Sequence, residues 1–244
     1  MFGKIFKILL TFIIIYYSSA VYGIENPAKI IASADSLFEK KQYTESMELY
    51  EQFFHSGFYT PRMLIRLSLI KEGLGDYTYA LYYLNLYYVK IPDKSVLKKM
   101  DELAARYNLQ GYDYNDLVFF ISLYDEYYSY IVIAFLITSL LFLGYLYLKW
   151  REKSGMGLRP LLFMVILGAV YMISNYNIIP EKAIVNSDAP LMSAPSAGAE
   201  LIGHINKGHR VTIRGQNDIW RKIYWNDKTA YILENNLLLV EEIK

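Results

Sequence analysis

The chain has 244 residues, with 25 basic and 24 acidic side chains and a formal net charge of +1. This balance argues against a protein that binds polyanions through bulk charge, and we expect no nucleic-acid partner. The sequence has no cysteine, which excludes disulfides, thiolate metal sites, cysteine nucleophiles and a cysteine-linked lipid anchor.

The amino terminus has the pattern of an export signal. Lys4 and Lys7 precede an apolar stretch, residues 8–17, that has the length of a signal-peptide core, and small residues follow it. We therefore predict a signal peptide over residues 1–23, with an uncleaved anchor as the alternative. Either form places the chain from residue 25 onward outside the cytoplasm.

Residues 24–115 contain an internal repeat with a period of 34, which aligns Pro27 with Pro61 and Tyr43 with Tyr77. A period of 34 is the tetratricopeptide spacing, in which each repeat is one helix–turn–helix unit. The segment resembles a degenerate tetratricopeptide repeat domain, and the resemblance implies a helical stack that binds peptides or protein surfaces.

Two repeats alone would leave an apolar end face uncovered. Residues 93–107 have apolar side chains at helical spacing, and we interpret them as a capping helix. Asp116 has a side chain suited to the start of a further helix, which we expect to continue into the membrane.

Four tyrosines lie close together on one predicted helix and cannot all face the core. Tyr83 and Tyr87 are four residues apart and are expected to pack inward. This leaves Tyr82 and Tyr88 as candidates for a partner-binding groove, because exposed aromatic residues often anchor interfaces.

Two apolar runs follow, at residues 130–148 and 161–173, and the first contains no charged residue. An apolar helix of about 20 residues can cross the hydrocarbon core of a bilayer. We predict transmembrane helices over residues 129–149 and 159–176. The second run is shorter, and a re-entrant segment or a core helix is its alternative.

The loop between the two runs is basic, with Lys149, Arg151, Lys153 and Arg159 against a single acid, Glu152. Basic loops beside membrane helices stay in the cytoplasm. The sequence therefore predicts a two-pass protein of a bacterial inner membrane, in contact with the lipid bilayer, with both larger domains in the periplasm.

Residues 181–244 change to short alternating runs separated by turn residues. We predict a loop over residues 188–199 and strands over residues 183–185, 200–205, 210–214, 220–225 and 229–232. Several short strands in about 60 residues indicate a small all-β barrel.

Four motifs in this segment occur in a fixed order: LMSAPS at residues 191–196, Ile202-Gly203, WRKI at residues 220–223 and Ala230-Tyr231-Ile232. In this order and spacing they resemble the bacterial SH3 domain. Met192 stands where that family has arginine, and Ala230-Tyr231 stands where it has Gly-Trp. The missing arginine weakens any polar ligand contact that the resemblance implies.

The resemblance implies a domain that binds peptides, in some members cell-wall peptides, between the loop and exposed aromatic residues. Trp220, Trp225 and Tyr231 are the candidates for that contact. The alternative for Trp220 is packing in the core or at its rim.

No residue pattern indicates catalysis. The histidines are His55, His204 and His209, and no acidic residue lies close to the latter two, whereas a metal site needs three or four converging ligands. The sequence has neither a nucleophile elbow nor a phosphate-binding glycine loop. We therefore expect a protein that is not an enzyme and has no cofactor and no metal.

The fold class predicted for the whole chain is a multi-domain membrane protein, with tetratricopeptide-like repeats, two transmembrane helices and an SH3-like barrel. This arrangement resembles the E component of the Bacteroides aerotolerance operon. The resemblance implies a scaffold for membrane proteins with von Willebrand A-type domains, working with a MoxR-type ATPase. The alternatives are an envelope anchor or sensor that binds peptidoglycan peptides, and an accessory subunit that positions another protein's substrate.

Overall fold

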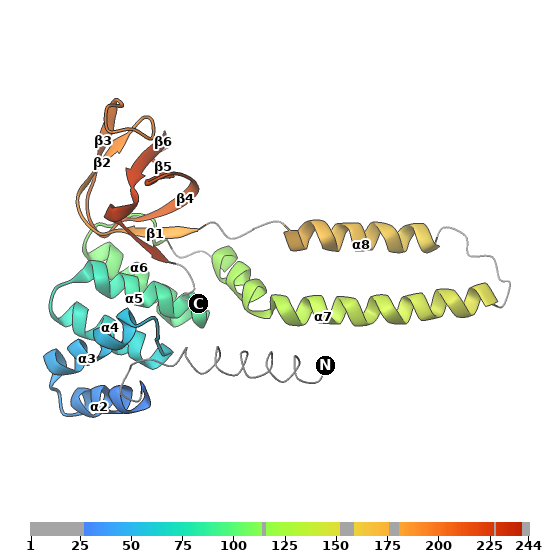
Figure 1. Ribbon diagram of the computed structural model, residues 1–244, viewed down its shortest axis with the longest axis horizontal. Helices are drawn as coiled ribbons and strands as arrows, with labels where there is room; N and C mark the ends of the chain where they lie inside the picture. Colours follow the sequence, from blue (N-terminus) through green and yellow to red (C-terminus); the bar gives the residue numbers. More distant parts are fainter. Residues whose placement is uncertain (1–26, 114–115, 152–158, 176–180, 227, 241–244) are drawn as a thin grey trace, which may run out of the picture. The chain divides into compact units, whose positions relative to one another are not determined.

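The computed structural model describes residues 27–113, 116–151, 159–175, 181–226 and 228–240 (Figure 1). The predicted signal peptide, residues 1–23, lies outside them. The chain divides into two compact units, Met1–Tyr59 and Thr60–Lys244.

The first unit contains one helical hairpin, formed by α2 (Pro27–Glu39) and α3 (Tyr43–His55). Ser46 is fully buried, and its hydroxyl donates a hydrogen bond to the carbonyl oxygen of Ala34 at 2.9 Å. Ala34 and Ser46 are small residues, and at this crossing they let the two helices approach closely.

The second unit begins with α4 (Pro61–Gly73), α5 (Tyr77–Lys90) and α6 (Lys94–Arg106). Each of these helices starts at a capping side chain: Thr60, Asp76 and Asp93 accept hydrogen bonds from the first-turn amides. α4 and α5 begin 34 residues after α2 and α3, so the predicted helical repeat is confirmed, while the tetratricopeptide identity stays a prediction.

The predicted capping helix is confirmed as α6, which packs against α5. Its apolar side chains are all buried: Val96, Leu97, Met100, Leu103 and Ala104.

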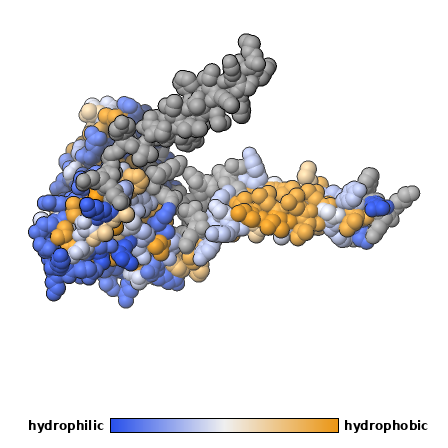
Figure 2. Space-filling model, turned by 60° about the horizontal axis from the view of Figure 1, so that its bottom comes forward, coloured by the Kyte–Doolittle hydropathy of each residue, from blue (hydrophilic) through white to orange (hydrophobic). Residues whose placement is uncertain are grey.

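α7 (Asp116–Arg151) is one continuous helix of 36 residues, as expected for a helix that continues into a membrane span. Within it, Tyr127–Lys149 is long and apolar enough to cross a membrane, and none of this stretch is buried. Its 23 residues extend about 34 Å as a helix, which exceeds the ~30 Å hydrocarbon core. Figure 2 shows the apolar surface concentrated on this helical segment.

One of the two predicted transmembrane helices, residues 129–149, is confirmed as a candidate span, and the second, residues 159–176, stays a prediction. Among the described residues, Tyr127–Lys149 is the single stretch that meets the length and composition of a span. α8 (Arg159–Asn175) is apolar but has 17 residues, or about 26 Å of helix. The predicted end of this span, residue 176, lies outside the described residues.

The carboxy-terminal part forms one antiparallel sheet with the strand order β3-β2-β6-β5-β4-β1-β7. The strands are β1 (Lys182–Val185), β2 (Ala189–Met192), β3 (Leu201–Ile205), β4 (Arg210–Asn217), β5 (Trp220–Trp225), β6 (Lys228–Leu233) and β7 (Leu237–Val240), with a 3-10 turn at Glu234–Asn236. The sheet curls around its apolar inner face (Figure 1), which carries residues such as Val185, Val211, Ile223 and Ile232.

One predicted loop is a strand. β2 lies within the predicted loop 188–199, although it contains Pro190, which cannot donate a hydrogen bond to a neighbouring strand. It pairs along its length with β3 and meets β6 at one residue pair, Met192 with Tyr231. The proline is tolerated because so little of β2 has strands on both sides.

The sheet is buried on two faces where β1 and β7 run. Ala183 and Val185 point into the inner face, whereas Ile184, on the opposite face, is also fully buried. α5 packs against β1 and β7 and covers this outer face. A strand covered on both sides reads as an uninterrupted apolar run, which is how β1 reads in the sequence.

Candidate functional site

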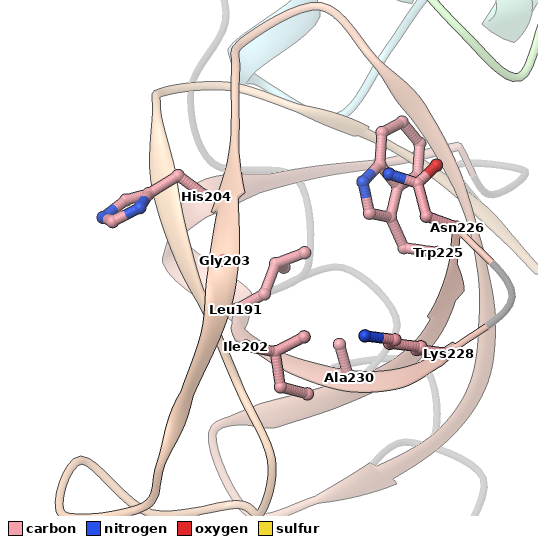
Figure 3. A pocket seen from close by; sticks show the side chains of 8 residues that line it. All are labelled: Leu191, Ile202, Gly203, His204, Trp225, Asn226, Lys228 and Ala230. Carbon is pink, nitrogen blue, oxygen red and sulfur yellow. The ribbon is translucent and has the colours of Figure 1, made fainter.

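A pocket of about 200 Å³ opens at one end of the curled sheet (Figure 3). Leu191 of β2, Ile202 of β3 and Ala230 of β6 form its apolar base, and Trp225 and Lys228 flank it. Figure 3 shows the Lys228 ammonium group reaching toward this base, while the His204 ring points away from it. The pocket can therefore hold a small apolar group beside a cation.

Trp225 owes its place in the pocket to strand alternation. It lies two residues beyond the core residue Ile223 on β5, so both side chains point to the inner face. Trp225 packs partly against the core, and its ring meets His209 edge-to-face with 5.0 Å between ring centroids.

The other two aromatic candidates of the sheet face the opposite way. Tyr231 pairs with Lys222 and Trp220 pairs with Leu233, which places both aromatic side chains on the outer face. Trp220 is 8% exposed and is therefore buried, which agrees with the alternative that it packs in the core or at its rim. The structure brings Trp225 alone, of the three, into the pocket.

A second feature is the joint between the helices and the sheet, centred on Arg210 of β4. Its guanidinium group donates to Oδ1 of Asn85 at 2.9 Å and to the carbonyl oxygen of Gly111 at 2.6 Å. It also lies over the ring of Tyr112, 4.7 Å from the centroid. Arg210 and Asn85 are 8% and 3% exposed, so these hydrogen bonds are shielded from water.

Backbone hydrogen bonds extend the joint along residues 110–112. The amide of Arg210 donates to the carbonyl oxygen of Gln110 at 3.0 Å, and the amide of Gln110 donates to Nδ1 of His209 at 2.9 Å. The Tyr112 hydroxyl donates to the carbonyl oxygen of Gly208 at 2.8 Å. One backbone and two side-chain hydrogen bonds thus tie the segment after α6 to residues 208–210.

Two glycines make this close approach feasible. A Cβ on Gly111 would lie 2.1 Å from the carbonyl oxygen of Arg210, and one on Gly208 would lie 2.9 Å from the Tyr77 ring. Both glycines have positive φ angles, +91° and +90°, which side-chain-bearing residues rarely adopt.

The joint changes the electrostatics of the groups inside it. Burial, and to a smaller extent the nearby charge of Arg210, lowers the pKa of Lys182 to about 8. Burial also lowers the pKa of Arg210 and of His209 and raises that of Tyr112. Lys182 and Arg210 place two positive charges close together in a poorly hydrated environment. The stability of the joint therefore depends on its hydrogen bonds.

The two tyrosine candidates of α5 differ in exposure: Tyr88 is buried, whereas the partner-binding role of Tyr82 stays a prediction. Tyr88 is 7% exposed and lies near Arg210, so it packs within the unit and offers no surface to a partner. Tyr82 is half-buried, and burial raises its pKa to about 12. Tyr83 is buried as expected, whereas Tyr87 is only half-buried.

Tyr88 is buried because the sheet already occupies one face of α5. Leu81, Asn85 and Tyr88 recur at helical spacing, and Asn85 on this stripe contacts Arg210. Sequence reasoning missed Arg210, Asn85 and the turn at Gly111. The one signal was that α5 is apolar on nearly every side, which indicates a helix covered from two directions.

No group of three His, Asp or Glu side chains that could hold a metal ion occurs in the described part of the chain. His204 and His209 do not converge on one site, because His204 is exposed while His209 lies in the joint.

Comparison with known proteins agrees with the geometry of the sheet. Residues 187–237 match the family described as bacterial SH3 domain, a range that includes the described lining residues of the pocket. No curated protein shows a significant match to the chain. The carboxy-terminal sheet is therefore similar to a bacterial SH3 domain, and it follows a helical, repeat-like region and one candidate membrane span.

Proposed function

We propose that this chain is a membrane-anchored, non-enzymatic binding protein whose SH3-like sheet holds a peptide ligand in the pocket beside Trp225. The observation that carries this proposal is the pocket itself, an apolar hollow flanked by Trp225 and Lys228 within residues 187–237. Mostly apolar pockets with a few placed polar groups are the usual form of ligand sites.

The joint supports a two-pass topology. Residues 60–113 and 182–240 share the buried hydrogen bonds of Arg210, so they lie in the same compartment. If α7 crosses the membrane, the chain must cross back between residues 151 and 181, and α8 is the described helix in that stretch. α8 is short, but bilayer thinning and interfacial side chains accommodate a short span at modest cost.

A contact between the two helices favours the same conclusion. The rings of Phe142 on α7 and Phe163 on α8 stack with centroids 5.0 Å apart. A paired α7 and α8 would form a hairpin whose predicted basic loop lies in the cytoplasm. With the export pattern at the amino terminus, this arrangement places the helices and the sheet in the periplasm.

Cysteine labelling tests this topology, because the natural chain contains no cysteine. Single substitutions at exposed Lys98 and Arg214, and at Ser154 in the predicted loop, give three reporters. With a membrane-impermeant maleimide on intact spheroplasts, we expect labelling of Lys98→Cys and Arg214→Cys but not of Ser154→Cys. Labelling of one of the first two without the other would exclude the topology.

Two classes of ligand are candidates for the pocket, a protein partner and a cell-wall peptide. Bacterial SH3 domains bind proteins or peptidoglycan, so stem peptides of the cell wall are the second candidate. The first is a protein partner, for which the resemblance to the aerotolerance E component suggests membrane proteins with von Willebrand A-type domains.

A binding assay separates the two candidates. The full chain in detergent is mixed with purified muropeptides, and in parallel it is purified from crosslinked cells to recover protein partners. Muropeptide binding that is lost in Trp225→Ala supports the cell-wall ligand, while a recovered protein that depends on Trp225 supports the scaffold. Failure of both, with the sheet folded, would refute peptide binding in this pocket.

A further inference from the structure

The described lining of the pocket carries a single charge, the ammonium group of Lys228. Its remaining described lining residues are neutral or histidine: Leu191, Ile202, Gly203, His204, Trp225, Asn226 and Ala230. Lys228 forms no ion pair with any residue that the structure describes, and it is exposed. By contrast, the carboxylates of Glu181 and Glu234 are held by Arg221 outside this lining.

We propose that the pocket takes the carboxylate end of a peptide whose last residue has a small apolar side chain. This inference rests on the proposed function, that the pocket holds a peptide, and it adds the chemistry of the part that enters. The carboxylate would lie against the Lys228 ammonium group, and the side chain of the last residue against Ile202 and Ala230.

The placement of the cation favours a chain end over an acidic side chain. In Figure 3 the Lys228 ammonium group reaches toward Ile202 and Ala230, and all three residues line the same pocket. At a chain end, the carboxylate and the side chain branch from one Cα atom and can satisfy both neighbours together. In aspartate or glutamate the carboxylate ends the side chain, and no alkyl branch lies beside it.

The volume of the pocket limits the size of the last residue of the bound peptide. A volume of about 200 Å³ equals that of about seven liquid water molecules at about 30 Å³ each. This is room for one or two small residues, whereas a bulky aromatic end would have to remain outside. The apolar base also lowers the local dielectric, which strengthens the attraction of Lys228 for a carboxylate.

Arg210 and Lys182, the cations of the joint, are not placed to bind the peptide carboxylate. The guanidinium group of Arg210 is directed to Asn85 and Gly111, and neither Arg210 nor Lys182 lines the pocket. Lys222 pairs with Tyr231 and lies on the outer face of the sheet, which makes it the matched control for Lys228.

The test compares two probes that differ only in their end: N-acetyl-alanyl-alanine with a free carboxylate, and the same peptide as its carboxamide. Binding to the full chain in detergent is measured by calorimetry. We expect the acid to bind about fivefold more tightly than the amide. Lys228→Gln should abolish this difference and Lys222→Gln should preserve it, and raising the salt to about 1 M should narrow it in the natural chain.

The outcomes separate this inference from the proposed function. Equal binding of acid and amide, with no effect of Lys228→Gln, would overturn the carboxylate inference and leave peptide binding standing. No binding of either probe at millimolar concentration would overturn the carboxylate inference, and the muropeptide and crosslinking experiments would then decide on the proposed function.

The same probes made from D-alanine identify the source of the carboxylate. Tighter binding of the D-peptide acid would assign the site to cell-wall stem peptides, and tighter binding of the L-peptide acid to a protein chain end. The inference would be refuted if neither the D-peptide nor the L-peptide bound more tightly as its acid than as its amide.

Discussion

Arg210 on β4 donates a hydrogen bond from its guanidinium group to Oδ1 of Asn85 on α5 at 2.9 Å, although 125 residues separate the two in the sequence. The intervening chain contains all of α7 and α8. The contact therefore closes a loop that contains the candidate membrane span, and it helps to join the sheet and helices α4 to α6 into one compact unit.

A consequence is that the pocket and the start of α7 are linked by short contacts. Trp225 flanks the pocket and meets His209, and His209 accepts the amide of Gln110 a few residues before α7 begins.

Replacing Arg210 tests how much the joint contributes to stability. Arg210→Met leaves the buried oxygens of Asn85 and Gly111 without their donor, and we expect the free energy of unfolding to fall by about 3 kcal/mol. Urea unfolding followed by tryptophan fluorescence measures this, because Trp220 and Trp225 lie in the sheet.

Arg214→Met is the matched control, since Arg214 is exposed on the same strand. We expect a change within about 0.5 kcal/mol. Equal losses in the two variants would show that the joint contributes no more than the surface does.

A comparison of Gly111→Ala with Gly75→Ala separates the free-energy cost of a steric clash from that of backbone strain. The added Cβ would meet the carbonyl oxygen of Arg210 at 2.1 Å, and φ at Gly111 is +91°. We expect a loss of about 3 kcal/mol, from both causes together. In Gly75→Ala, φ is +76° but the space is open, so strain alone should cost about 1 kcal/mol. Thermal unfolding of both variants measures the difference, and a Gly75→Ala loss as large as that of Gly111→Ala would contradict this account.

Local patterns were enough to predict most of the elements. The 34-residue period sets the starts of α4 and α5, and the predicted strand 220–225 is confirmed as β5 without a change of bounds. These elements depend on turn residues and on apolar spacing within a few residues, both of which are visible in the sequence.

The joint could not be predicted in the same way. Arg210 alternates with the buried Val211, so the strand pattern assigns it to the solvent face. That face is covered because α5 and residues 110–112, all far away in the sequence, pack on it. The same long-range packing buries Tyr88, which the helical pattern left at the surface.

The stability of the joint should depend on pH through His209. Nδ1 of His209 accepts the Gln110 amide, and a protonated imidazole cannot accept there. Burial lowers its pKa below the ordinary 6.5, so the neutral ring is favoured in the folded state. The stabilisation is complete above about pH 6.5 and is lost as the pH falls through the lowered folded pKa.

His209→Gln keeps an acceptor oxygen but removes the titration. We expect the natural chain to lose stability relative to this variant between about pH 7 and pH 5, measured by urea unfolding at each pH. Parallel pH profiles for the two proteins would show that His209 does not report on the joint.

The pocket should depend on Trp225 and not on Tyr231, although both are aromatic residues of the same sheet. Trp225 faces inward and flanks the hollow, whereas Tyr231 pairs with Lys222 on the outer face. Trp225→Ala removes one wall, and we expect the affinity for the alanyl-alanine acid to fall by about tenfold or more. Tyr231→Ala should leave that affinity within about twofold, since Tyr231 does not line the pocket.

Trp225 also packs on His209, so a second variant is needed as a control. Trp225→Phe keeps an aromatic edge for the His209 contact, and it therefore distinguishes the loss of a pocket wall from a loosened joint. If Tyr231→Ala weakened binding as much as Trp225→Ala, the ligand would lie on the outer face and the pocket would not be its site.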